Sequence, residues 1–233
     1  MADWIDNFTN KFYLNFIKDN RWQYITRGLW TTVRITVFAV LLGVAIGFLV
    51  AIIRSTHDKT GKLTIANFIC RVYLTVIRGT PVVVQLLIIY FGIFASVNIS
   101  KMIVAVIAFG INSGAYVAEI VRSGIMSIDK GQFEAGRSLG FNYVQTMWYI
   151  IMPQAFKNVL PALGNELIVL LKETSVSGYI AMEDLTKGGD IIRSRTYDAM
   201  MPLLAVALIY LIIVMLLEFA VGKLERRLRN SDH

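Results

Sequence analysis

Uncharged hydrophobic runs of membrane-spanning length recur along this chain and constrain its fold more than any other feature. Four of them lie at residues 35–53, 79–100, 102–118 and 199–217. A further stretch, residues 158–184, is apolar but carries Glu166, Lys172 and Glu173. A helix needs about 20 apolar residues to cross about 30 Å of hydrocarbon. Because 56% of the residues are hydrophobic and only 17% are charged, the sequence predicts an all-α integral membrane protein with about five transmembrane helices.

The positive charge of the chain is distributed in a way that predicts its topology. The net charge is +7, and the basic residues gather in residues 54–71, 122–157 and 223–229. Five crossings would place these three regions on one side of the membrane, which the positive-inside rule makes cytoplasmic. We therefore expect the N-terminus outside and the C-terminus in the cytoplasm. The basicity is interpreted as a topology signal, which argues against nucleic-acid binding.

The beginning of the chain, residues 1–25, is predicted to be an amphipathic segment in the membrane interface. Apolar residues recur there at helical spacing, namely Trp4, Ile5, Phe8, Phe12 and Phe16. Such a helix lies along the interface and does not cross the bilayer. No repeat or low-complexity tract divides the sequence, and we interpret the polar stretch 55–62 as a loop. Residues 1–233 are therefore predicted to form a single transmembrane domain.

A polar segment between the third and fourth predicted crossings carries helix signals of its own. Asp129 is followed three residues later by Gln132, and Asn142 is followed at the same spacing by Gln145. Each pair is close to the capping-box pattern that begins a helix. Gly140 supplies a left-handed stop between them. The segment is predicted to form a short helix, a sharp turn and a second helix, which is the shape of a docking element.

The spacing of this segment resembles the cytoplasmic EAA loop of permease subunits of ABC importers. Gly136 stands where alanine is more usual, and Met152 where leucine is more usual. In that family the loop, here about residues 128–153, carries a coupling helix that sits in a cleft of the ATP-hydrolysing subunit. The resemblance assigns coupling to the ATPase to Glu134, Ala135, Gly136, Gly140, Ile150 and Pro153. An ordinary amphipathic loop helix is the alternative interpretation.

Three further stretches resemble the polar amino acid uptake family within the ABC importers. They are R-G-T-P at residues 78–81, N-S-G-A-Y-V-A-E-I-V-R-S-G at 112–124 and L-K-E-T-S at 171–175. The resemblance covers most of the chain and implies the type I ABC importer permease fold in a bacterial inner membrane. It also implies a homo- or heterodimeric pore with a second permease subunit, two copies of an ABC ATPase subunit and an extracytoplasmic amino-acid-binding protein.

The sequence contains no pattern typical of an enzyme. The pair Gly61-Lys62 is followed by Leu63, where a nucleotide-binding P-loop needs Ser or Thr. Two histidines, His57 and His233, are too few for a metal cluster. We therefore expect no catalytic residue, no metal and no cofactor in this chain, with ATP and Mg²⁺ bound by the partner ATPase.

Polar residues inside the apolar segments are the candidates for the solute pathway, because ionisable groups in a bilayer are costly and usually face a cavity or a partner. The candidates are Thr80, Asn112, Ser113, Tyr116, Glu166 and Lys172. Asn112 and Tyr116 are four residues apart and are expected on one helix face, where they either contact solute or form hydrogen bonds between helices. Glu166 is the acidic group best suited to a cationic or zwitterionic solute. Glu119 and Arg122 are expected to form a structural ion pair.

The sequence thus predicts a permease subunit for a polar or charged L-amino acid that works by alternating access. Two other classes stay open. The chain could be an autonomous ion-coupled amino acid carrier, which uptake by the purified chain alone would favour. It could instead be a membrane scaffold or regulatory subunit without a pore, which absence of uptake in the presence of all partners would favour.

Overall fold

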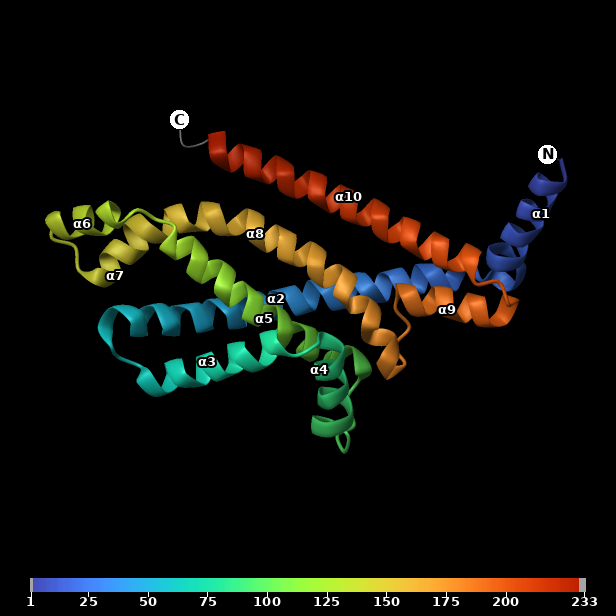
Figure 1. Cartoon of the computed structure of the whole chain (residues 1–233), viewed down its shortest axis with the longest axis horizontal. Helices are drawn as coiled ribbons and strands as arrows, with labels where there is room; N and C mark the ends of the chain where they lie inside the picture. Colours follow the sequence, from blue (N-terminus) through green and yellow to red (C-terminus); the bar gives the residue numbers. More distant parts are fainter. Residues whose placement is uncertain (1, 231–233) are drawn as a thin grey trace. The chain divides into compact units, whose positions relative to one another are not determined.

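A computed structural model describes residues 2–230 of the chain, and within these residues it contains helices and no strand. Three helices are long and apolar enough to span a membrane (Figure 1): α2 (Trp22–Thr60), α5 (Lys101–Met126) and α10 (Met200–Asn230). The predicted crossings at residues 35–53 and 102–118 lie inside α2 and α5, and the one at 199–217 begins one residue before α10, so those predictions are confirmed. A broken pair of helices, Thr64–Gly79 and Val82–Ile93, passes the same test as one unit, which gives up to four spans by length and composition.

The second predicted crossing, residues 79–100, is wrong in its bounds. The chain forms α3 (Thr64–Gly79), breaks at Thr80 and Pro81, and continues as α4 (Val82–Ile88) and the π-helical η3 (Ile89–Ile93). Proline donates no backbone hydrogen bond and fixes φ near the value of a first helical turn, so α4 begins directly after Pro81. The apolar run after residue 79 therefore supplies only the short second member of this bent helix pair, which forms a broken span or a re-entrant loop. Sequence reasoning missed α3 because Arg71 and Arg78 interrupt its apolar pattern.

The described residues cluster into two compact units. One contains Met1–Ala39, Val82–Phe109 and Val169–Leu216, and the other contains Val40–Pro81, Gly110–Ile168 and Leu217–His233. The chain passes between the units inside four continuous helices, which are α2, α5, α8 (Met152–Glu173) and α10. The remaining boundary, between Pro81 and Val82, falls at the break between α3 and α4.

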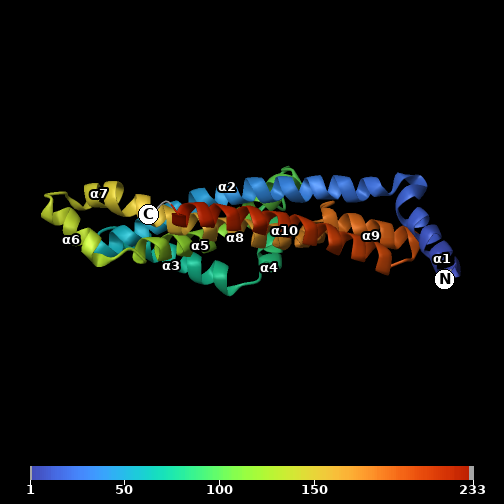
Figure 2. The same ribbon diagram turned by 90° about the horizontal axis from the view of Figure 1, so that it is seen from above.

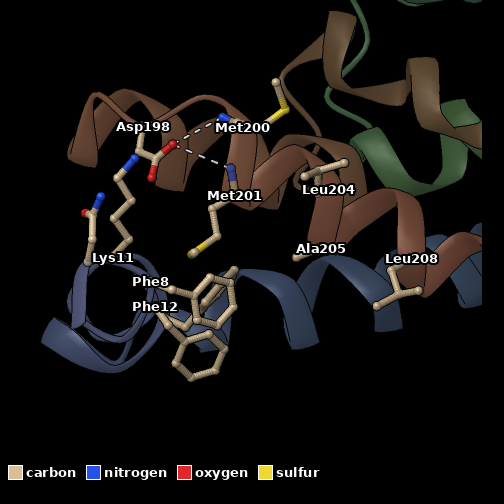
Figure 3. A pocket seen from close by; sticks show the side chains of 11 residues that line it. Phe8, Lys11, Phe12, Asp198, Met200, Met201, Leu204, Ala205 and Leu208 are labelled. Atoms are coloured by element: carbon tan, nitrogen blue, oxygen red, sulfur yellow. Dashed lines mark hydrogen bonds between the residues drawn. The ribbon is translucent and has the colours of Figure 1, made fainter. Parts of the chain in front are cut away.

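In the first unit the N-terminal segment packs against the beginning of α10. It consists of α1 (Ala2–Phe12), a π-helical turn η1 (Tyr13–Ile17) and a 3₁₀ turn η2 (Lys18–Asn20). Figure 3 shows Phe8, Phe12 and Met201 directed toward a cavity of about 470 Å³. Asp198 accepts hydrogen bonds from the backbone N–H groups of Met200, at 3.2 Å, and Met201, at 3.5 Å. A helix is therefore present at residues 2–12 of the predicted segment, and Asn15 Nδ2 links the following turn to the start of α10 by donating to Asp198 Oδ2 at 3.0 Å. The position of residues 1–25 in the membrane interface stays a prediction.

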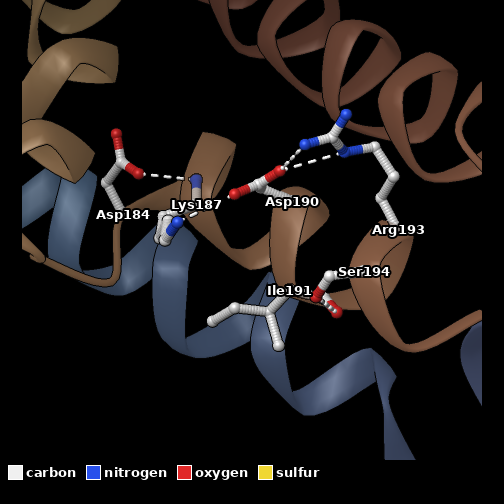
Figure 4. Close-up of polar contacts among 6 residues, drawn as sticks. All are labelled: Asp184, Lys187, Asp190, Ile191, Arg193 and Ser194. Atoms are coloured by element: carbon white, nitrogen blue, oxygen red, sulfur yellow. Dashed lines mark hydrogen bonds and ion pairs between the residues drawn. The ribbon is translucent and has the colours of Figure 1, made fainter.

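The same unit contains α9 (Leu185–Thr196), a helix with a charged side. Asp184 caps it by accepting a hydrogen bond from the Lys187 N–H at 2.7 Å. One turn further on, Asp190 accepts from Lys187 Nζ at 2.8 Å and from Arg193 Nη2 at 2.5 Å (Figure 4). The hydrogen bond from Lys187, and next that from Arg193, hold the pKa of Asp190 below its usual value. The opposite side of α9 buries Leu185 and Ile192 against the beginning of α2 and α10.

In the second unit α2, α5 and α8 approach one another closely through glycines. A Cβ atom on Gly47 would lie 2.4 Å from the Val117 side chain, and one on Gly124 would lie 2.3 Å from that of Val159. These contacts bring α5 against α2 and α8. Small residues permit such close helix packing in membranes.

The polar stretch 55–62 is mostly helical, which corrects the prediction of a loop. Helix α2 continues to Thr60, and only residues 61–63 lie between it and α3. A polar composition at a helix end does not exclude helix, because the side chains of the final turns can reach water. The predicted fourth crossing, residues 158–184, corresponds to α8 followed by a 3₁₀ segment, η5 (Thr174–Ile180).

Candidate functional site: a helical hairpin and a polar cavity

The polar segment after α5 forms a helical hairpin, α6 (Lys130–Ser138) and α7 (Tyr143–Thr146), which continues through the π-helical η4 (Met147–Ile151) into α8. The two short helices lie side by side in both views (Figure 1 and Figure 2). Residues 129–151 are called the hairpin below. The predicted helix, turn and second helix are confirmed.

The two helix starts of the hairpin are capped differently. Asn142 and Gln145 form a complete capping box, with reciprocal side-chain-to-backbone hydrogen bonds of 2.9 and 3.0 Å. Asp129 caps α6 by accepting from the Gly131 N–H at 2.7 Å, and Gln132 does not return a bond to it. The Gln132 side chain instead accepts from Gln154 Nε2 at 3.4 Å. The first predicted capping box is therefore a single cap.

Gly140 makes the turn of the hairpin. Its φ is +80°, which a residue with a Cβ atom rarely adopts. The Gly140 N–H donates to the Arg137 carbonyl at 2.9 Å, and the Phe141 N–H donates to the Gly136 carbonyl at 3.0 Å. These two bonds form a Schellman motif, which satisfies carbonyl groups at the end of α6.

Gly136 faces the interior of the hairpin. A Cβ atom there would lie 2.6 Å from Thr146 Cγ2 and 3.2 Å from Ile150 Cδ1. The glycine therefore lets α6 pack closely against Thr146 and Ile150 of the same hairpin. Glu134 and Ala135, by contrast, are exposed. Glu134 borders a cavity of about 200 Å³ together with Lys130, Phe133, Arg137, Tyr143 and Thr146.

Four large apolar side chains of the hairpin are at least 66% exposed, and sequence reasoning did not identify them. Their exposed fractions are 72% for Leu139, 71% for Val144, 69% for Trp148 and 66% for Tyr149. A polar surface loop has no structural need for such residues, and exposed apolar side chains that gather on one element commonly mark an interaction site. The sequence offered one indication of these residues, because they are large and apolar yet stand in a segment whose charges predict contact with water.

Pro153 is the second residue of α8 and follows directly on the π-helical turn η4. Its ring removes one backbone donor at the point where the hairpin joins the long helix. The chain is helical from Tyr143 to Glu173 across this junction. Ile151, in the same turn, is completely buried and packs in the core of the second unit with Val121 and Ala155.

A polar cavity of about 600 Å³ lies in the second unit between α3, α5 and α8. It is lined by Arg78, Tyr116, Glu119, Ile120, Ser123, Gly124, Ser127, Asn158, Ala162 and Glu166. We call it the polar cavity. On its α8 side, Glu166 accepts a hydrogen bond from Ser113 Oγ at 2.8 Å. Ser113 is completely buried, so its hydroxyl holds the Glu166 carboxylate from behind.

Glu119 is surrounded by three arginines, whereas the sequence predicted one partner. Arg54 Nη1 lies 2.8 Å from its carboxylate, Arg78 Nη1 lies 3.7 Å away, and Arg122 Nε also lies 3.7 Å away. Arg54 is thus the nearest of the three. It was missed because it lies 65 residues earlier, on α2, and only the fold brings the two together. The guanidinium of Arg78 also lies over the ring of Tyr116, 5.8 Å from its centroid.

The six predicted pathway residues do not form one site. Tyr116 and Glu166 line the polar cavity, and Ser113 supports Glu166 from behind. Asn112 is buried and does not line the cavity, so it does not share an exposed face with Tyr116. Thr80 donates to the Val76 carbonyl at 2.8 Å at the end of α3. Lys172 is exposed and belongs to the first compact unit.

Comparison with known proteins decides the family. The model of the family described as "Binding-protein-dependent transport system inner membrane component" matches residues 43–230. The chain belongs to this family. It is a permease subunit of the inner membrane and not an enzyme, and the family implies an ATPase and a binding protein as partners. Permeases of this family carry no cofactor of their own.

Relatives of this permease match it along most of its length. A putative glutamine transport system permease protein of Rickettsia typhi is 40% identical and covers 88% of this chain and 93% of its own. The arginine transport system permease protein ArtQ of Bacillus subtilis is 38% identical and covers 90% and 94%. The glutamine transport system permease protein GlnP of Escherichia coli K12 is 39% identical and covers 84% of this chain and 90% of its own.

Solved structures match the fold of the permease. The crystal structure of an amino acid ABC transporter with histidines is 42% identical, covers 88% of this chain and 94% of its own, and superimposes with a TM-score of 0.81. The MetNI methionine ABC transporter, in an inward-facing conformation, is 21% identical with a TM-score of 0.76 and covers 91% and 99%. The type I importer permease fold predicted from the sequence is thereby confirmed.

Proposed function

We propose that this permease subunit transports a polar or charged L-amino acid into the cell. Its relatives are named as glutamine and arginine permeases, and two of them are 40% and 38% identical over about nine-tenths of the chain. The observation that carries the proposal is the polar cavity, which presents carboxylates and a guanidinium in one space of about 600 Å³. Ligand pockets for small molecules occupy about 300–1,000 Å³. A zwitterion carries the two opposite charges that such a lining complements.

Within the polar cavity each charged end of the solute has a suitable partner. Glu166, held by Ser113, accepts from the α-ammonium group, and Arg78 donates to the α-carboxylate. Charge-assisted hydrogen bonds of this kind are about twice as strong as neutral ones. Tyr116 flanks the arginine and limits its rotamers. Glu119, Arg122 and Arg54 form a structural ion-pair cluster next to the cavity and do not bind the solute.

The hairpin is proposed to couple the permease to ATP hydrolysis. Glu134, Ala135 and the exposed apolar residues dock in a cleft of the ATPase subunit, while Gly136, Gly140, Ile150 and Pro153 hold the hairpin and its junction with α8 in shape. Two ATPase subunits bind ATP and Mg²⁺, and a second permease subunit, identical or related, completes the pore. ATP binding closes the ATPases and turns the pore outward, where an extracytoplasmic binding protein releases the amino acid.

Orientation and domain organisation complete the proposal. The N-terminus lies outside with the interfacial segment 1–25, and the C-terminus and the hairpin lie in the cytoplasm. The two compact units are parts of one transmembrane domain, because four helices continue from one unit into the other. α8 is the crossing that completes the expected number of five.

Neutralising Glu166 tests the solute assignment. In proteoliposomes that contain the permease with its ATPase and binding protein, Glu166→Gln is expected to raise the KM for the amino acid about tenfold, since a charge-assisted bond contributes about 1.5–3 kcal/mol. Glu183→Gln, which changes an exposed carboxylate elsewhere, is the matched control. An unchanged KM would remove Glu166 from the pathway. Uptake by the permease without its ATPase would contradict the whole proposal and show that the protein is an autonomous carrier.

Removing the exposed Glu134 carboxylate tests the coupling assignment. Glu134→Ala is expected to lower ATP-dependent uptake at least about tenfold, because a charged contact with the ATPase is lost at the point of force transfer. Insertion and thermal stability should stay as in the wild type, since the side chain is exposed. Ser138→Ala, another exposed change on α6, serves as the control. Normal uptake by Glu134→Ala would contradict the assignment.

A further inference from the structure

A second cavity of the same compact unit is lined by three arginines and one carboxylate. Its volume is about 430 Å³, and it lies between α2, α3 and α5. The lining residues are Arg54, Arg71, Leu74, Thr75, Arg78, Gly79 and Glu119. We call it the arginine cavity. Arg78 and Glu119 also border the polar cavity, whereas Arg54 and Arg71 do not.

The charges of the arginine cavity do not balance. Three guanidinium groups face one carboxylate, and that carboxylate is already within 2.8 Å of Arg54 and within 3.7 Å of Arg78. Arg122 approaches the same carboxylate from the other side, again at 3.7 Å. Within residues 2–230, Arg71 forms no ion pair with any acidic side chain. Cationic groups in membrane helices normally pair with an anion, since an unpaired charge there is costly.

The position of the cavity on α3 brings it near a membrane surface. Arg71 lies seven residues after Thr64, the first residue of α3, which corresponds to about 10 Å along the helix. Arg71 and Arg78 are seven residues apart and therefore share a helix face. The same helix exposes large apolar side chains, namely Ile65, Phe68, Ile69, Val72 and Val76. One helix thus offers an apolar surface for acyl chains and a basic recess beside it.

We propose that the arginine cavity binds the phosphate group of an anionic phospholipid from the leaflet next to the turn between α2 and α3. Arginines donate bidentate hydrogen bonds to phosphate oxygens, and the guanidinium is less strongly hydrated than an ammonium group. Basic pockets between membrane helices on the cytoplasmic side bind acidic headgroups by the same chemistry. The lipid anion supplies the negative charge that Glu119 alone does not provide. Arg54 and Arg71 hold the phosphate and do not line the polar cavity, whereas Arg78, which borders both cavities, is left to the solute, so the site does not depend on which amino acid is transported.

Arg71→Gln tests the proposal with little risk to the fold, because Arg71 is exposed and takes part in no ion pair of the described chain. The purified permease–ATPase complex in detergent would be mixed with phosphatidylglycerol or phosphatidylcholine and examined by native mass spectrometry. The wild type is expected to retain one phosphatidylglycerol for each copy of this chain and to prefer it over phosphatidylcholine. Arg71→Gln should weaken retention of phosphatidylglycerol about tenfold. Lys223→Gln, an exposed basic change on α10, should retain it as the wild type does.

Three outcomes would overturn the proposal. Equal retention of phosphatidylglycerol by Arg71→Gln and the wild type would show that the cavity is not the lipid site. Complete displacement of the lipid by the transported amino acid would assign the cavity to the solute pathway. Retention of inorganic phosphate by the complex, without any retained lipid, would show that the cavity binds a soluble anion and not a phospholipid. Amino acid uptake, measured in parallel, reports on the solute assignment separately.

Discussion

Leu139→Asp is expected to release the permease from its ATPase partner. Leu139 is 72% exposed at the end of α6, and Val144, Trp148 and Tyr149 of the same hairpin are similarly exposed. Burying a leucine side chain contributes about 1.5–3 kcal/mol. Placing a carboxylate in the interface removes that contribution and adds the cost of desolvating a charge. The combined loss predicts a Kd for the ATPase at least about 100-fold higher.

The measurement is co-purification of the ATPase with a tagged permease from solubilised membranes, quantified by titration in detergent. Val144→Asp should have the same effect from the other helix of the hairpin. Tyr197→Asp is the matched control, since Tyr197 is a fully exposed aromatic residue on another element, with a positive φ that aspartate tolerates. Elution as a single species would verify that each variant is folded. Unchanged ATPase binding by both hairpin variants would mean that the exposed apolar residues have another role.

Glu119→Gln is expected to destabilise the permease much more than Arg122→Gln. The Arg54 side chain is only 16% exposed and donates to Glu119 at 2.8 Å, so neutralising the carboxylate leaves a guanidinium largely buried without its anion. Breaking such a pair costs about 3 kcal/mol. For a chain of this length the midpoint of thermal unfolding would fall by about 10 °C. Arg122 is more exposed and 3.7 Å away, so its loss should cost less than about 1 kcal/mol.

Thermal unfolding of the detergent-solubilised permease measures this difference. A double variant, Glu119→Gln with Arg54→Gln, separates pairing from a general effect of the substitution. Because it removes both charges of the closest pair, it should recover part of the lost stability. Equal midpoints for Glu119→Gln and Arg122→Gln would show that Arg54 is not the principal partner. If the unfolding midpoint of the double variant is no higher than that of Glu119→Gln, the unpaired charges of Arg78 and Arg122 cause most of the destabilisation.

The sequence predicted the features that depend on neighbouring residues. Apolar runs located α2, α5 and α10, because crossing a bilayer requires a continuous apolar stretch within one helix. The second start and the turn of the hairpin were predicted correctly at Asn142 and Gly140, since caps and left-handed turns are formed by residues that are close in sequence. The break between α3 and α4 at Pro81 was not predicted, because the apolar run at residues 79–100 indicated one continuous crossing.

Features that depend on distant parts of the chain were not predicted. The contact between Arg54 and Glu119 joins residues 65 positions apart, and no local pattern indicates it. The exposure of Leu139 and Trp148 was only hinted at by their place in a charged segment, and it became clear once the fold showed that the described residues leave them uncovered. Asn112 was placed beside Tyr116 from helical spacing, but neighbouring helices decide which of the two reaches a cavity.

The contact of Gly136 with Thr146 has an evolutionary consequence. A methyl group at position 136 would lie 2.6 Å from the Thr146 side chain, so alanine fits there only if residue 146 is smaller or the two helices stand further apart. The two positions are therefore expected to vary together among permeases, with glycine accompanied by a branched residue and alanine by a small one. Exchanging hairpins between two such proteins would preserve their shape only if both positions were transferred as a pair.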